Sequence, residues 1–163
     1  ADYEGWSRFQ SIQNNFSLLN RRFMDELANV CRQEQVSLLP YSPLGGGVLS
    51  GKYNLGEVPA NSRFNDYRQS GEARQRAMAD RFLNEGTLAS TARYLEIAAE
   101  AGLAPVTLAT AWSMQNDFVA STIIGARTAE QLEDSLAALE VTLEGDGLRE
   151  CDAVHAYILY PTG

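Results

Sequence analysis

The sequence contains a single histidine and only two cysteines. Cys31 and Cys151 lie near opposite ends of the chain, and with His155 they are too few for a structural zinc site, which takes about four closely spaced Cys and His ligands. We therefore expect no metal site. Each cysteine lies among apolar residues at helical spacing, which is typical of a buried free thiol.

Cationic side chains and long apolar runs are also scarce. Thirteen Lys and Arg residues oppose 21 Asp and Glu residues, and the net charge of −8 disfavours nucleic acid and anionic membranes as partners. No apolar run approaches the roughly 20 residues that span a bilayer, and the opening ADYEGWSRFQ lacks the features of a signal peptide. We expect a cytoplasmic protein. The same opening resembles the end of a helix that leads into a strand, so we expect that an upstream sequence has been lost.

The length and composition indicate a single domain over residues 1–163, because 163 residues that are 45% hydrophobic can bury one sizeable core. Short apolar runs predict strands over 9–14, 36–41 and 118–124. Apolar positions at helical spacing predict helices over 21–34, 72–84, 90–101, 105–115, 128–139 and 146–157. The polar tract 45–71 is long enough to be a lid or a binding loop.

The alternation of strands and helices predicts an α/β fold with parallel strands and right-handed crossovers. Such a succession often closes into an eight-stranded barrel, which takes about 250 residues. Three predicted strands, or four with one unrecognised, cannot close that barrel. Part of the barrel is therefore missing from this chain.

The stretch YSPLGGGVLSGKY, residues 41–53, follows the second predicted strand. Glycines past a strand let backbone N–H groups approach a ligand, and Lys52 adds a cation that suits phosphate. The alternative is an ordinary loop in which Gly45, Gly46 and Gly47 provide turn geometry and Lys52 is solvated. The stretch matches neither GxGxxG nor GxxxxGK[ST], so both interpretations stay open.

The stretch STIIGARTAEQLEDSL, residues 121–136, places an arginine directly before a predicted helix. Thr128 and Gln131 match a capping box, so the helix begins near Ala129 and Arg127 precedes the cap. The start of a helix carries unpaired N–H donors and about half a positive charge, which favour an anion. In the alternative, Arg127 is a solvated surface residue beside a structural cap. Because both motifs follow the C-terminal ends of parallel strands, we expect them to share one extended, phosphate-bearing ligand.

Four stretches together resemble the C-terminal half of an aldo-keto reductase: IQNNFSLLNR at 12–21, YSPLGGGVLSGKY at 41–53, FVASTIIGARTAEQLEDSL at 118–136 and VHAYILYP at 154–161. The likeness covers essentially the whole chain and is closest to the bacterial NADP(H)-dependent branch related to potassium-channel β subunits. It implies an α/β fold that is a partial (β/α)8 TIM barrel with about three parallel strands and surrounding helices. The three strands would correspond to the sixth, seventh and eighth of the family.

The resemblance implies that NADP(H) lies extended across the C-terminal ends of the strands. Gln13 would hydrogen-bond the nicotinamide amide, and Tyr41 would stack on the nicotinamide ring. The pyrophosphate would be lined by Ser42, Pro43, Leu44, Gly45 and Gly46, with Lys52 and Arg63 closing over it. The adenosine 2′-phosphate would meet Gly125, Arg127 and Gln131, and the adenine would meet Asp134 and Ser135. The family more often has asparagine at the position of Ser135.

The family reduces carbonyls by hydride transfer, with a tyrosine proton donor assisted by lysine, aspartate and often histidine, all from the first half of the barrel. None of those motifs is in this chain, so we expect no catalytic residue here and a structural role for His155. The resemblance then implies the NADP(H)-binding half of an enzyme, which does not catalyse alone. The alternatives are a free-standing half-barrel that serves as a binding or interaction module, and an inactive truncated product.

An opened barrel leaves strand edges and an apolar inner face uncovered, and both favour association. We therefore expect either a homo-oligomer or a complementary N-terminal half as the partner of this chain.

Overall fold

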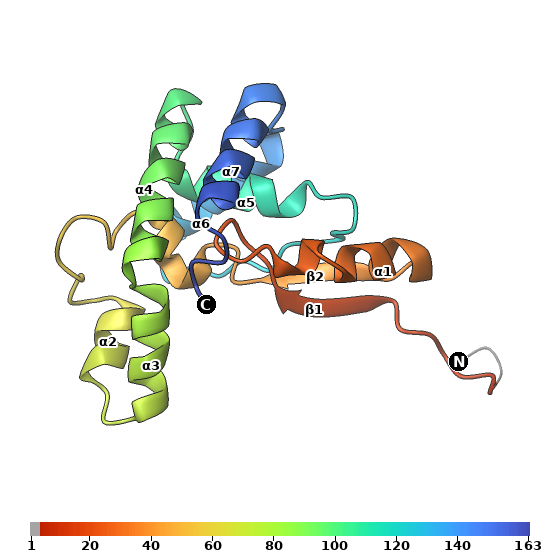
Figure 1. The fold of residues 1–163 in the computed structure, drawn as a ribbon, viewed down its shortest axis with the longest axis horizontal. Coiled ribbons are helices and arrows are strands. Elements are labelled where there is room, and N and C mark those ends of the chain that lie inside the picture. Colours follow the sequence, from red (N-terminus) through yellow and green to blue (C-terminus); the bar gives the residue numbers. More distant parts are fainter. Residues whose placement is uncertain (1–3) are drawn as a thin grey trace.

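The computed structural model describes residues 4–163, in which a short parallel sheet has helices packed on one side and β1 at its open edge (Figure 1). β1 (Ser11–Asn15) and β2 (Ser37–Tyr41) pair in parallel, from Ser11 opposite Ser37 to Asn15 opposite Tyr41. The helix α1 (Leu27–Glu34) lies in the connection between the two strands. The predicted α/β class is confirmed. The predicted helix end falls partly on residues 1–3, outside the described residues, and residues 4–10 contain a turn but no helix.

The third predicted strand, over 118–124, does not form a regular strand. This segment touches β2 only through isolated parallel bridges, Leu38 with Val119 and Tyr41 with Ile123. The carbonyl of Pro40 accepts a hydrogen bond of 2.8 Å from the backbone N–H of Ile123. Pro40 has no N–H to donate in return, so the ladder loses one bond and continuous pairing is interrupted. The apolar run lies beside β2, but the prediction that it forms a strand was wrong.

Helices form most of the rest of the chain. The α-helices are α2 (Arg63–Gln69), α3 (Ala73–Phe82), α4 (Glu85–Glu100), α5 (Pro105–Met114), α6 (Ala129–Leu136) and α7 (Gly145–Tyr157), and the 3-10 helices are η1 (Arg22–Met24), η2 (Gly45–Ser50) and η3 (Ala137–Glu140). None of the helices within residues 4–163 combines the length and the apolar character that crossing a bilayer requires.

Two helix predictions and one loop prediction need correction. The helix expected over 21–34 is divided into η1 and α1, because Glu26 leaves the helical conformation with φ −128°. The helix expected over 90–101 begins at Glu85, since the side chain of Asn84 accepts a 2.9 Å hydrogen bond from the N–H of Thr87 and caps it. The tract 45–71 is not structureless, because it contains η2 and α2.

The core lies where the helices meet the sheet. Phe16 packs against Trp112 and Phe118, with ring centroids 4.9 and 5.5 Å apart. The guanidinium of Arg21 is buried 4.4 Å above the Trp112 ring. Cys31 and Cys151 are both buried and unbridged, as the sequence predicted.

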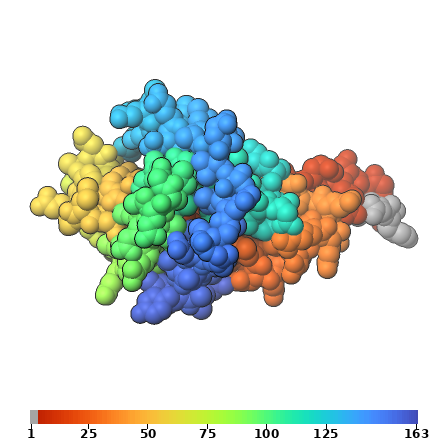
Figure 2. Space-filling view, turned by 90° about the horizontal axis from the view of Figure 1, so that it is seen from above, coloured from red at the N-terminus to blue at the C-terminus, as the bar shows by residue number. Residues whose placement is uncertain are grey.

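β1 is an edge strand of the described sheet, and large apolar side chains beside it are exposed. Trp6 and Phe9, which precede β1, are 72% and 87% exposed, and Leu27 and Val30 of α1 are 40% and 47% exposed. With Ile12 they line a second cavity of about 970 Å³. Figure 2 shows the segment that leads into β1 at one end of the molecule. These side chains form an exposed apolar surface beside the edge of β1.

Candidate functional site

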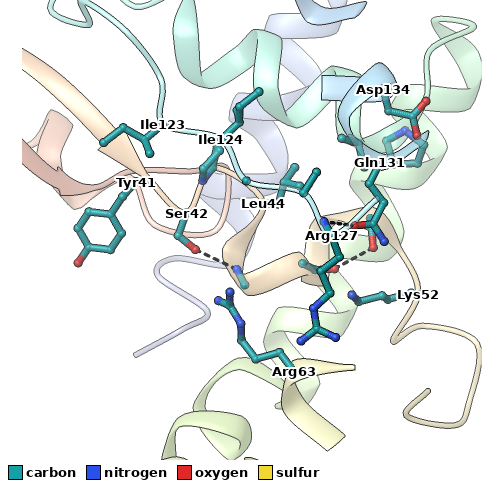
Figure 3. A pocket seen from close by; sticks show the side chains of 18 of the residues that line it. Tyr41, Ser42, Leu44, Lys52, Arg63, Ile123, Ile124, Arg127, Gln131 and Asp134 are labelled. Atoms are coloured by element: carbon teal, nitrogen blue, oxygen red, sulfur yellow. Dashed lines mark hydrogen bonds between the residues drawn. The ribbon is translucent and has the colours of Figure 1, made fainter. Parts of the chain in front are cut away.

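A cavity of about 720 Å³ lies at the C-terminal ends of β2 and of the segment 118–124. Its walls come from the connection between β2 and η2, the loop before α2, the first residues of α5, and the loop that leads into α6. In Figure 3, Tyr41 lies on one side of the cavity, and Gln131 and Asp134 lie on the opposite side. The glycine motif and the arginine motif therefore open into the same cavity, as parallel strands require.

The glycine loop is held by hydrogen bonds within itself. Ser42 has a positive φ of 58°, and its carbonyl accepts from the N–H of Gly45 at 2.9 Å while its Oγ accepts from the N–H of Gly46 at 3.0 Å. The N–H of Gly47 donates to the carbonyl of Leu44 at 2.9 Å. This differs from the expectation that glycine N–H groups face a ligand. An anion must either displace these bonds or bind to the side chains of the cavity.

The glycines are required because the loop packs closely against the core. A Cβ at Gly46 would lie 2.6 Å from Cζ of Phe64, and one at Gly45 would lie 2.8 Å from Cδ1 of Leu19. Both glycines also have positive φ, 55° at Gly45 and 68° at Gly46, which disfavours any other residue. Phe64 is buried and stacks on Phe82 with centroids 5.3 Å apart. The loop and the start of α2 therefore form one packed unit.

Arg63, the first residue of α2, is placed by this unit. The side chain of Ser62 caps α2 by accepting from the N–H of Asn65 at 3.4 Å, and the buried ring of Phe64 anchors the first turn. Arg63 itself is exposed and lines the cavity. A polar tract with no clear hydrophobic period thus places the backbone of Arg63 at the wall of the cavity.

The loop before α6 is fixed by the cap that the sequence predicted. Thr128 Oγ1 accepts from the N–H of Gln131 at 3.3 Å. Gln131 Oε1 accepts at 3.0 Å from the N–H of Arg127, one residue earlier than in a capping box. The guanidinium of Arg127 donates to the carbonyl of Asn61 at 3.4 Å. Arg127 therefore joins the loop before α6 to the loop before α2.

The cavity concentrates positive charge in an acidic chain. Lys52, Arg63 and Arg127 line it, and Asp134 is its one acidic side chain. Among the described residues, no ion pair includes any of these three cations, although Lys52 lies 5.1 Å above the ring of Tyr53. Figure 3 shows the three cationic side chains reaching the same part of the cavity. Since the net charge of the chain is −8, the cavity is a local concentration of positive charge, which favours an anion.

Most of the residues that the sequence assigned to a site line this cavity: Tyr41, Ser42, Pro43, Leu44, Gly46, Lys52, Arg63, Gly125, Arg127, Gln131 and Asp134. Gly45, within the glycine loop, is buried and does not line the cavity. Ser135 is also buried, and its Oγ donates to the carbonyl of Gln131 at 3.4 Å. Gln13 lines the second cavity, beside the edge of β1.

Sequence reasoning missed other lining residues: Gly47, Ser50, Asn61, Pro105, Val106, Ile123, Ile124 and Ala126. Several of them are neighbours in sequence of the predicted site residues, and that proximity could have identified them. Asn61 and the start of α5 had no such signal, because only folding brings them to the cavity.

Among the described residues, the histidine and the two cysteines lie outside the cavity. His155, in α7, contacts the ring of Tyr160 at 5.4 Å, and burial, followed by the charge of Arg21, lowers its pKa. Burial raises the pKa of Cys151 to about 11, so its thiol stays protonated. Within residues 4–163, no three His, Cys, Asp or Glu side chains lie together as metal ligands would.

Comparison with known proteins identifies relatives of the chain. Residues 1–156 match the profile of the Aldo/keto reductase family. The chain is 41% identical over 165 residues to Protein tas of Escherichia coli (strain K12), covering 99% of this chain and 44% of that protein. It is 33% identical over 129 residues to the L-glyceraldehyde 3-phosphate reductase of the same organism, covering 78% of this chain and 36% of that protein. It is 35% identical over 108 residues to a probable voltage-gated potassium channel subunit beta of Arabidopsis thaliana, covering 65% and 30%.

The fold is also similar to that of a glycerol dehydrogenase from Gluconobacter oxydans, with a TM-score of 0.71 at 20% identity. That similarity covers 92% of this chain and 43% of the other. The chain belongs to the aldo/keto reductase family, and the resemblance noted in the sequence is confirmed. Its relatives include oxidoreductases by name, and it spans less than half the length of each of these proteins.

Proposed function

We propose that the cavity binds NADP(H), and that the chain is the cofactor-binding half of an aldo/keto reductase barrel. The observation that carries this proposal is the set of three cations without ion pairs, Lys52, Arg63 and Arg127, in one cavity at the C-terminal ends of the strands. Guanidinium groups suit phosphate, and the N-terminus of α6 adds a favourable field. The residues present therefore fit a ligand with several phosphates.

The proposed roles divide the cavity into three regions. Tyr41, which is 42% exposed, offers its ring to the nicotinamide. Gln13 of β1 is assigned to the nicotinamide amide from the family resemblance, and because Gln13 lines the second cavity, the nicotinamide must extend past Tyr41 toward the edge of β1. The pyrophosphate lies along the loop Ser42, Pro43, Leu44, Gly45 and Gly46, held by Lys52 and Arg63. The 2′-phosphate lies near Gly125, Arg127 and Gln131, and the adenine lies near Asp134 and Ser135.

The glycine N–H groups donate within their own loop, so this proposal assigns the phosphates mainly to the cationic side chains. When bound, NADP(H) supplies the hydride for reduction of a carbonyl. The residues of this chain bind and orient the cofactor, and we propose that this chain alone does not turn over a carbonyl substrate. In this proposal residues 1–163 form one domain, part of a (β/α)8 barrel, in the cytoplasm.

The exposed edge of β1 supports a second part of the proposal. Trp6 and Phe9 are largely exposed beside a strand with no partner on its outer side within the described sheet. Such edges and apolar patches favour association. We propose that either a complementary N-terminal half or a second copy of the chain covers it. The same exposed surface favours the second candidate function, an interaction module without redox activity.

Calorimetric titration tests the cofactor proposal. We expect wild-type protein to bind NADPH more tightly than NADH, and Arg127→Ala to weaken NADPH by about tenfold or more while NADH changes little, since a charge-assisted bond contributes about 1.5–3 kcal/mol. Arg93→Ala is the matched control, because Arg93 is an exposed arginine of α4 that pairs with Glu96 outside the cavity. Equal losses for both ligands, or no loss for either, would contradict the proposal.

A further inference from the structure

We propose that Asn65 is a positioning residue for Arg127, acting across the cavity through the loop before α2; this inference rests on the proposed NADP(H) site. The side-chain Nδ2 of Asn65 donates to the carbonyl of Ala60 at 2.8 Å. Its backbone N–H donates to Oγ of Ser62 at 3.4 Å. Asn65 therefore fixes the chain on both sides of Asn61.

The carbonyl of Asn61 is what Arg127 contacts. One guanidinium nitrogen of Arg127 donates to that oxygen at 3.4 Å, while the backbone N–H of Arg127 donates to Gln131 Oε1 at 3.0 Å. Both ends of this long side chain are therefore held, the backbone by α6 and the guanidinium by the loop that Asn65 fixes. No ion pair among the described residues gives Arg127 another anchor.

Asn65 can be changed without displacing α2. The helix is anchored by Phe64, which is 1% exposed and packs against Tyr53, Tyr67 and Phe82 at centroid distances of 5.5, 6.0 and 5.3 Å. Loss of the Asn65 amide frees the Ala60 carbonyl and the segment up to the cap. The aromatic packing that places Arg63 stays in place.

The consequence is selective. A guanidinium that is already restrained loses less conformational freedom when it binds an anion. Removing the restraint therefore weakens ligands that contact Arg127, and it leaves unchanged those that do not. In the proposed site, Arg127 meets the 2′-phosphate, which NADPH carries and NADH lacks. Asn65 thus contributes to cofactor discrimination although it does not line the cavity.

A double-mutant cycle tests this inference with Asn65→Ala, Arg127→Ala and the double variant, titrated with NADPH and NADH. We expect Asn65→Ala to weaken NADPH by about threefold to tenfold, in line with one hydrogen bond, and to leave NADH unchanged. In the Arg127→Ala background the same change has no further effect. Gln69→Ala is the control, because Gln69 Nε2 donates to Asn65 Oδ1 at 3.3 Å but contacts neither Ala60 nor Asn61 by a hydrogen bond.

The outcomes separate the two proposals. If Arg127→Ala leaves NADPH binding unchanged, the proposed cofactor site fails. If Arg127→Ala acts as expected but Asn65→Ala weakens both ligands equally, or still acts without Arg127, the positioning role is overturned.

A ligand-free measurement tests the restraint directly. We expect the side-chain Nε–H resonance of Arg127 to show faster local motion in Asn65→Ala than in wild type or Gln69→Ala. Unchanged Arg127 motion in Asn65→Ala contradicts the inference whatever the affinity for cofactor.

Discussion

The ring of Phe64 lies so close to Gly46 that a Cβ at Gly46 would sit 2.6 Å from Phe64 Cζ. This contact joins the glycine loop after β2 to the first turn of α2, which carries Arg63. The glycine-rich sequence therefore serves packing as well as any ligand. The placement of Arg63, one of the three cations of the cavity, depends on it.

We predict that Gly46→Ala destabilises the protein by about 2–4 kcal/mol, through strain at positive φ and overpacking against Phe64. Urea unfolding measures the effect. Gly56→Ala is the matched control, because Gly56 also has positive φ, 94°, but no atom lies within 4 Å of its added Cβ. We expect about 1–2 kcal/mol there. Equal losses in the two variants would show that the Phe64 contact has no cost.

Arg21→Ala is expected to destabilise the fold much more than Asp152→Ala. The Arg21 side chain is 4% exposed, donates to the Cys151 carbonyl at 2.8 Å and to Asp152 at 2.6 Å, and covers the ring of Trp112. Asp152 is 68% exposed, so in Asp152→Ala water can take the place of the lost carboxylate beside Arg21. We expect about 3 kcal/mol for Arg21→Ala and less than about 1 kcal/mol for Asp152→Ala by urea unfolding. Similar losses would refute the claim that packing dominates.

Stability should fall on acidification through His155. Burial, and then the charge of Arg21, lowers its pKa from 6.5, although Asp25 and Asp152 oppose this. A lowered pKa means that the native state favours the neutral ring. The contribution of His155 to stability is therefore fully present above its ordinary pKa in the unfolded chain, and it is lost as the pH falls from there through the lower pKa of the native state. Between about pH 7.5 and about pH 5, we expect His155→Asn to lose less stability than wild type. Thermal unfolding across that range measures this, and parallel pH profiles would contradict it.

Association at the edge of β1 is the fourth prediction. Sedimentation velocity at micromolar concentration should show wild-type protein above the monomer mass of 17.9 kDa, either alone or with the complementary N-terminal half proposed above. Val30→Lys should reduce this association, because it places a charge on a 47% exposed apolar position. Leu139→Lys, at a 66% exposed leucine of η3, is the control. A compact monomer, both for the chain alone and with the added polypeptide, would contradict the prediction. Equal effects of the two variants would show that this surface does not mediate the association.

Local sequence signals predicted several features of the site correctly. Thr128 caps α6 because its hydroxyl reaches an N–H three residues ahead, an interaction that depends on neighbours alone. The glycine motif at 41–53 and the arginine motif at 121–136 meet at one cavity because parallel strands present their C-terminal ends on one side. The start of α4 was missed because Asn84 was assigned to the end of the helix predicted over 72–84, whereas its side chain caps α4.

The sequence by itself determined the α/β class, the family, the cap at Thr128 and most of the residues around the cavity. Only the tertiary structure decided three other matters: the interruption of the 118–124 strand beside Pro40, the internal use of the glycine N–H groups, and the reach of Arg127 to Asn61. The physical reason is the range of the interaction. Periodicity and capping act over a few residues, whereas Asn61 and Arg127, or Gly46 and Phe64, meet only after the core has packed.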